Sequence, residues 1–162
     1  MAEPLISVVD LLRNRMTDPN SSNRIGDNWI YPDWPRIEEG DGELSTNSFP
    51  RISCVYVDER GRPYAVGSSA LLISSQIQID VWCSTKQEPL NVGGADKKKE
   101  QALADYLARQ VVKEIDDHWH DDISHFERIE LISKFPIDPD IENGIFRHTL
   151  IYQFEYKSTS VE

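Results

Sequence analysis

Histidines and carboxylates gather in one short stretch, EIDDHWHDDISH, between Glu114 and His125. Its twelve positions hold three histidines and five acidic residues. Imidazole and carboxylate groups are common ligands of transition metals in proteins. His118, His120 and Asp122 are the candidate metal ligands, and a metal-dependent hydrolase is one function that they could support. The alternative is a solvated helix end in an acidic protein.

The spacing of these residues favours the helix end. In a helix, His118 and Asp122 share a face, whereas His118 and His120 point to nearly opposite sides. In an extended segment the two histidines share a face, but the neighbouring aspartates lie on the other. No single regular conformation gathers three ligands, as an HExxH pattern does. We therefore predict no metal and no other cofactor, and we expect Trp119 to pack while the acids face water.

Other catalytic groups do not assemble either. The serines lie in strand or turn context without a GxSxG elbow. Cys54 and Cys83 lie in apolar, strand-like runs; they could pair if their strands were neighbours, but we expect two buried free thiols. Gly93 and Gly94 precede a lysine run without the P-loop pattern. No nucleophile, base and electrophilic stabiliser form a set, so the sequence argues against an enzyme.

Length and charge set the class of protein. The chain has 162 residues, which suits one domain with its own core. Its net charge of −11 predicts repulsion from nucleic acid and from anionic membranes over most of the surface. The N-terminus lacks a signal-peptide pattern, and no apolar run reaches membrane-spanning length. We expect a soluble protein with no membrane contact.

Hydrophobic periodicity predicts the elements that must position any site. Apolar residues at helical spacing predict a helix over 5–16 and a longer one from a cap at Asp96 to about Asp116. Alternating or β-branched runs predict four strands, over 51–59, 70–84, 126–135 (ended by Pro136) and 146–157, with a turn at 58–63. The predicted fold class is α+β: residues 1–162 form a single domain whose one mostly antiparallel sheet contains a long hairpin. An N-terminal helix and one longer central helix pack on that sheet.

The longest connection, residues 17–48, contains the aromatic cluster NWIYPDWP. Large aromatic side chains prefer burial, here either against the chain's own sheet or against a partner, and the sequence leaves both open. Two arginines in the predicted hairpin turn could touch an anionic partner. The hypothetical partner-contact residues are Trp29, Tyr31, Trp34, Arg60 and Arg62.

The order of these elements resembles the tail-terminator (tail-completion) proteins of long-tailed viruses that infect bacteria and archaea. After an amphipathic N-terminal helix, the resemblance rests on the segments FPRISCVY, QIQIDVWCS, KKKEQALADYLARQVVKEI, FERIELISKF and FRHTLIYQFEY. The tryptophan of IDVWCS, with the lysine- and alanine-rich helix after it, is the most specific part. The resemblance covers residues 5–16 and 49–156, and the loop at 17–48 is longer than the family's usual link.

The resemblance implies a structural protein of the virion, with no catalytic residues and no cofactor. Such a protein forms a homo-oligomeric ring, expected to be a hexamer, which caps the tail tube and joins it to the head or neck. Its partners would be the tail tube protein and a head-closure or neck protein, assembled in the host cytoplasm. DNA would pass through the ring without specific binding, and the acidic composition predicts an acidic lumen that repels it.

Three alternatives remain. The nearest is a head-closure (stopper) or neck connector protein of the same head-tail interface, which has a similar size and also forms rings. A metal-dependent hydrolase would use His118, His120 and neighbouring acids. A small cytoplasmic binding module would hold a partner with its aromatic loop.

Overall fold

The computed structural model describes residues 3–24, 28–34, 49–63, 70–85, 88–92, 97–140 and 144–158. The helix cap predicted at Asp96 lies outside these residues. The elements, in chain order, are α1 (Pro4–Arg15), β1 (Ile30–Tyr31), β2 (Arg51–Pro63), β3 (Leu71–Ser84), α2 (Glu100–Asp122), β4 (Arg128–Asp140) and β5 (Ile145–Ser158).

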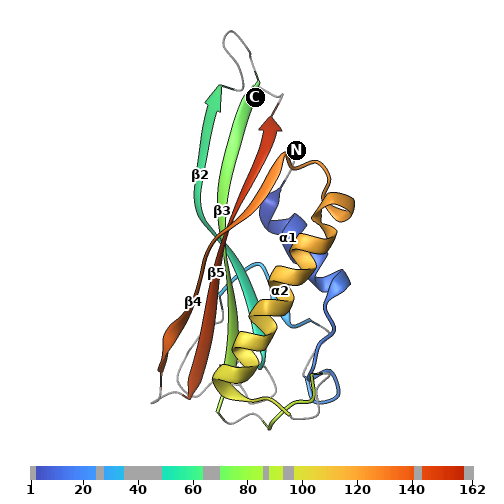
Figure 1. Cartoon of the computed structure of the whole chain (residues 1–162), viewed down its shortest axis with the longest axis vertical. Coiled ribbons are helices and arrows are strands. Elements are labelled where there is room, and N and C mark those ends of the chain that lie inside the picture. The colour runs from blue at the N-terminus through green and yellow to red at the C-terminus, as the bar shows by residue number, and fades with distance from the viewer. Residues whose placement is uncertain are drawn as a thin grey trace.

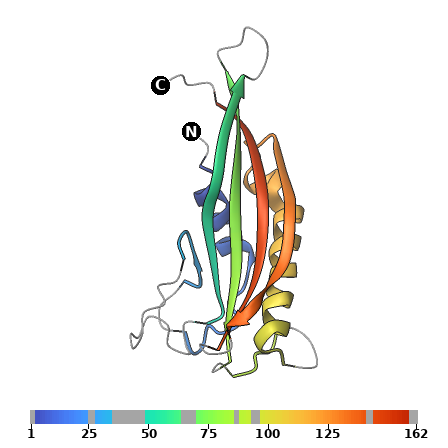
Figure 2. The same cartoon turned by 90° about the vertical axis from the view of Figure 1, so that its left-hand side faces the viewer.

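The five strands form one sheet in the order β1-β2-β3-β5-β4. β1 is parallel to β2, and the other three pairs are antiparallel. Both helices lie on the same face of the sheet, and the described residues place no helix on the other face, here called the open face (Figure 1, Figure 2). The predicted α+β class is confirmed, including the mostly antiparallel sheet, the long β2–β3 hairpin and the two helices.

Alternation along the strands sends one set of side chains toward the helices. Ile77, Ile79 and Val81 of β3 are fully buried there. They pack with an apolar stripe on each helix, and the two stripes together comprise Val8, Val9, Leu11, Leu12, Leu103, Leu107, Val111 and Ile115. The apolar residues that alternate along the strands thus pack against the apolar stripes of the helices in one core, as the sequence predicted.

Two predicted boundaries are wrong, because strand pairing overrides local turn signals. The turn expected at 58–63 is strand: β2 continues until Pro63 lies opposite Leu71 of β3. Gly61 suits this segment, since a Cβ there would approach Ile73 Cδ1 to 3.1 Å. Pro136 does not end β4, which continues to Asp140. β4 pairs with β5 alone in the described sheet, and proline is tolerated on an edge strand, where its missing N–H breaks no bond on the free side.

α2 continues past the predicted end near Asp116 and contains most of the histidine-rich stretch. The helix ends at Asp122, where the N–H of Ile123 donates to the carbonyl of Trp119 at 3.1 Å. Trp119 is partly buried against the core, while Ile123 and Phe126 are buried outright. The stretch is therefore a helix end that leads into β4, as predicted, but Ile123 and Phe126 fix it more firmly than Trp119 does.

Candidate functional site

The histidine-rich end of α2 was the first candidate for chemistry, and its side chains have separate partners. His118 Nε2 lies 3.2 Å from Glu114 Oε2, one helical turn earlier. His120 stacks on Trp119, with ring centroids 3.7 Å apart. Asp122 accepts two hydrogen bonds of 2.9 Å from Arg15, which tie the ends of α1 and α2 together. Within the described parts of the chain, no group of three or more His, Cys, Asp or Glu residues could hold a metal ion.

We predict that zinc or manganese will not bind stoichiometrically to this helix end. Because His118, His120 and Asp122 do not converge, the metal content after dialysis should stay far below one ion per chain. The unfolding temperature should not rise with added metal, since an ion that binds only the native state must raise it. Metal analysis of the wild-type protein and of the His118→Ala/His120→Ala variant tests this. One bound ion that the double substitution removes would revive the hydrolase hypothesis.

A buried polar network lies on the open face of the sheet. Asp80 of β3 is fully buried. Its carboxylate accepts hydrogen bonds from the Thr149 hydroxyl on β5 and, at 2.9 Å, from Gln78 Nε2. Arg147 Nε lies 3.7 Å from the same carboxylate, and the Arg147 guanidinium stacks 4.8 Å from the ring centroid of Trp82. The network joins β3 to β5 through side chains on the open face.

A second polar pair faces the helices. His148 of β5 is buried, and its Nδ1 lies 2.6 Å from Asp105 Oδ1 on α2. Gln101 Nε2 donates to the same oxygen at 2.8 Å. Burial raises the pKa of Asp105, but the hydrogen bonds from His148 and Gln101 outweigh burial and hold this pKa below its ordinary value of 3.8. The pair therefore fixes α2 on the sheet through an ionised carboxylate.

The lowered pKa of Asp105 predicts a pH dependence of stability. A carboxyl whose pKa is lower in the folded than in the unfolded state stabilises the fold above its unfolded pKa. That contribution disappears as the pH falls from about 4 through the folded-state pKa. Asp105→Asn should remove it, so the unfolding temperature of the variant should fall less steeply between pH 5 and pH 2 than that of the wild type. Parallel curves for the two proteins would contradict the assignment.

The surroundings of the two cysteines disfavour their thiolate forms. Cys54 and Cys83 are free and buried, as predicted. Burial is the largest cause that raises the pKa of each thiol, and nearby carboxylates add to it. A thiol with a raised pKa is poorly reactive, since the thiolate is the reacting species.

The surface formed by the described residues contains a cleft beside α1 and a hollow on the open face. A cleft of about 350 Å³ separates the end of α1 from α2 and the 88–92 segment. Its Arg15 is bound to Asp122, and its Tyr106 hydroxyl donates to the carbonyl of Val92 at 2.7 Å. A polar hollow of about 320 Å³ lies on the open face and is lined by Asp58, Arg60, Ser74, Gln76 and Gln153. In the hollow, Asp58 and Arg60 form an ion pair with each other at 2.8 Å.

The aromatic residues suggested for partner contact have different positions. Trp29 is only 4% exposed and lies in the chain's own core, so it presents no surface to a partner. The side chain of Tyr31, on β1, lies under Arg51, whose guanidinium carbon is 4.0 Å from the ring centroid. Trp34 is 55% exposed. The sequence did not predict β1, which pairs with β2 and holds this segment on the sheet.

Arg60 and Arg62 are both exposed, on the part of β2 near its C-terminal end. Arg60 forms an ion pair with Asp58 at 2.8 Å. The partner-contact hypothesis stays a prediction: Trp34, Arg60 and Arg62 are exposed, and Tyr31 is partly exposed.

Exposed large apolar side chains concentrate at two opposite edges of the sheet. Among the described residues, those on the β2 side are Ile6, Trp34, Tyr56 and Val57, and those on the β4 side are Ile132 and Phe135. Leu71 is the first residue of β3. Ile6 belongs with the β2 side because the neighbouring Leu5 N–H donates to the Tyr56 hydroxyl at 3.4 Å. Single exposed apolar side chains are common on protein surfaces, so what distinguishes these residues is their position at the two edges. The spacing of apolar residues in the sequence did not predict which of them are exposed at these edges, because the same residue types also occur in buried strands.

Comparison with known proteins does not assign the chain: no protein-family model matches it, and no curated protein matches its sequence. Neither helix of the described structure combines the length and apolar character needed to cross a lipid bilayer.

Proposed function

We propose that this chain is a structural protein that assembles into a ring and acts as a tail terminator, capping the tail tube of a long-tailed virus and joining it to the head. The resemblance in element order suggests this role and six copies in the ring. The tail tube protein and a head-closure or neck protein are the proposed partners, and the virion is the proposed location.

The observation that carries the proposal is the pair of outer sheet edges, formed by strands that pair on one side with no other described strand over most of their length. β2 and β4 are at opposite sides of the described sheet, apart from the short β1, which pairs only with Ile52 and Ser53 of β2 (Figure 2). The two edge strands run in opposite directions, because three antiparallel pairings separate β2 from β4. A copy placed beside another therefore continues the antiparallel sheet. Such heterologous contacts produce a ring when the rotation between copies closes.

The charge on the two faces supports passage of DNA without tight binding. Among the side chains that the structure describes, the open face of the strands carries six basic ones (Arg51, Arg60, Arg62, Arg128, Arg147, Lys157) and four acidic ones (Asp58, Asp80, Glu130, Glu155). α2, on the other face, carries seven acidic and two basic residues. A channel lined by α2 would be acidic, as the composition predicted, and a channel lined by the open face would be nearly neutral. Neither surface is the strongly basic groove that binds phosphates tightly.

The mass of the assembly tests this proposal. Light scattering should give a multiple of the 18.6 kDa chain, either for the purified protein alone or after it is mixed with tail tubes. A ring that binds heads or neck proteins but not tubes would instead indicate a stopper or neck connector. A protein that stays monomeric and does not bind the tail tubes would exclude the terminator function.

A further inference from the structure

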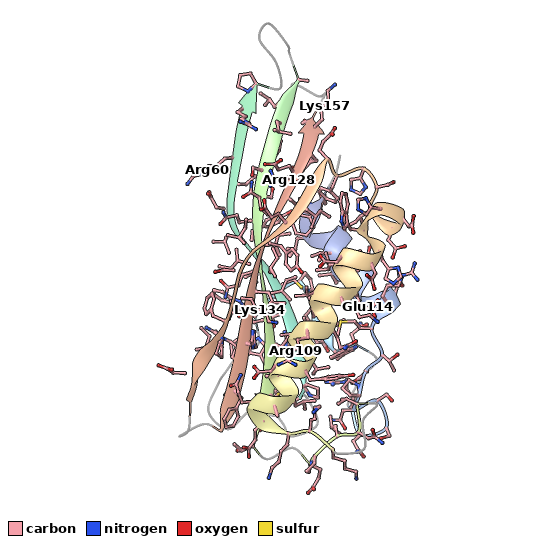
Figure 3. All side chains as sticks on the ribbon, viewed as in Figure 1. Arg60, Arg109, Glu114, Arg128, Lys134 and Lys157 are labelled. Atoms are coloured by element: carbon pink, nitrogen blue, oxygen red, sulfur yellow. The ribbon has the colours of Figure 1, made fainter. Side chains whose placement is uncertain are left out.

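The cleft between the end of α1 and α2 has one long wall, which α2 supplies. Tyr106, Gln110 and Glu114 line it from successive turns of the helix, so this wall is about 12 Å long. Figure 3 labels Glu114 on the side of α2 that borders the cleft. The cleft volume of about 350 Å³ lies at the lower end of the range for small-ligand sites. One small ligand, or one side chain of another protein, therefore fits in it.

Part of the cleft lining is apolar. Met16, Val92 and Leu107 all contribute to it. Met16 and Val92 are partly buried against the core, and Leu107 is buried. The ring of Tyr106 is held in place, because its hydroxyl donates to the carbonyl of Val92 at 2.7 Å. An alkyl chain that covers such a surface gains free energy with each methylene group that it removes from water.

Glu114 places a carboxylate at one end of this lining. Its Oε2 lies 3.2 Å from His118 Nε2. Within the part of the chain that the structure describes, its Oε1 has no hydrogen-bond partner. Arg15 lines the same end, but its guanidinium already donates two hydrogen bonds of 2.9 Å to Asp122. Glu114 Oε1 is therefore open to a donor from a ligand.

The charges around Arg15 make this end of the cleft negative. The hydrogen bond to Asp122 is the main cause that raises the pKa of Arg15, and the nearby charges of Glu114 and Asp121 add to it. Three carboxylates against one guanidinium leave an excess of two negative charges, of which a protonated His118 would offset one. The net charge of −11 on the whole chain acts in the same direction. A cation is therefore attracted to this end, and an anion is repelled.

The other end of the α2 wall already has a cation beside it. Lys98 Nζ lies 5.8 Å from the ring centroid of Tyr106, two helical turns before Glu114. This distance is within the range of a cation–π contact. A second cation is therefore favoured at Glu114 and disfavoured near Tyr106. The charges thus orient a ligand, with its positive group toward Glu114 and its apolar part toward Tyr106.

We propose that this cleft binds an alkylammonium group, with the ammonium against Glu114 Oε1 and the methylene stem along Met16 and Leu107. Two sources share this chemistry, namely a free aliphatic amine and the lysine side chain of another protein. A lysine side chain commonly lays its methylene stem on an apolar surface while its ammonium reaches a polar one. Such binding needs a single copy of the chain and is independent of the proposed ring.

Methyl NMR titrations at pH 8, where alkylamines are charged, test the site. Both n-butylamine and Nα-acetyl-lysine methylamide should shift the methyl signals of Met16, Val92 and Leu107. The uncharged Nα-acetyl-norleucine methylamide should bind about fivefold more weakly than the lysine compound, or worse, and pentanoate should not bind. From ethylamine to n-butylamine, the affinity should rise about two- to fourfold for each methylene group.

Glu114→Gln should weaken the binding of n-butylamine about fivefold, because the carboxylate becomes a neutral amide. Asp116→Asn is the matched control, since it removes an exposed carboxylate two residues further along, on the opposite side of α2, and should leave the affinity unchanged. Circular dichroism melting confirms that both variants fold.

Three results would overturn the proposed site. They are equal affinity for the norleucine and lysine compounds, an affinity that does not change with stem length, and equal weakening by the two substitutions. The last would mean that amines are attracted to the acidic surface in general. An affinity for the lysine compound about tenfold above that for n-butylamine would identify a lysine side chain of another protein as the ligand. Equal or weaker affinity would identify a free amine, and either result supports an alkylammonium site.

Discussion

Replacing Asp80 with alanine is expected to lower the free energy of unfolding by about 3 kcal/mol or more. Asp80 is fully buried, and its carboxylate holds Thr149, Gln78 and Arg147 in place. Alanine would leave these groups without their acceptor on a buried part of the open face. An unsatisfied buried polar group costs about 1–3 kcal/mol, which explains the size of the expected effect. Urea unfolding, followed by circular dichroism, measures it.

Gln153→Ala is the matched control for this prediction. Gln153 also lies on the open face, but it is only partly buried, and its amide donates to Glu155 at the surface side of the sheet. Its loss should cost about 1 kcal/mol or less. Equal losses for the two variants would mean that the Asp80 network contributes no more than an ordinary surface hydrogen bond.

Replacing either Val57 or Ile132 with lysine is expected to abolish the assembly without unfolding the chain. Both side chains are about half exposed in the single copy, so each variant should fold normally. In a ring joined through the sheet edges, the lysine would replace an apolar side chain that faces the next copy. Burying an unpaired charge costs several kcal/mol, so association should weaken about a hundredfold or more. Light scattering over a concentration series, with thermal melting of the same samples, measures both properties.

Ala102→Lys provides the control, because it adds the same charge at an exposed position of α2. This variant should assemble like the wild type. If it dissociates as readily as the edge variants, net charge rather than edge contact governs the assembly. If the edge variants assemble normally, the copies meet through another surface.

The sequence predicts the architecture because the strongest periodic signals belong to the core. The alternation from Ile77 to Cys83 predicts β3, and the apolar stripe of α2 predicts the central helix. Residues that usually end secondary structure were less reliable guides to where the strands end. Pro136 and the 58–63 segment both carry turn signals, yet long-range pairing keeps both within strands. β1 was not predicted, since a strand of two residues has no periodicity of its own.

The candidate site was harder to predict than the fold. The histidines at the end of α2 suggested chemistry, but spacing alone indicated that they do not converge. The exposed edges depend on which strands become outermost and on where the bulges fall. Val57 and Ile132 resemble ordinary interior strand residues until the pairing of their neighbours is known. One sequence without its strand order does not contain that information.

Electron microscopy of tail tubes mixed with the purified protein is the most direct test of the central claim. The proposal predicts added density at one end of the tube, and an averaged end-on view of that density should show a closed ring of identical copies with an open centre. Tubes whose ends remain bare at saturating protein, or density along the tube wall without a ring, would contradict it.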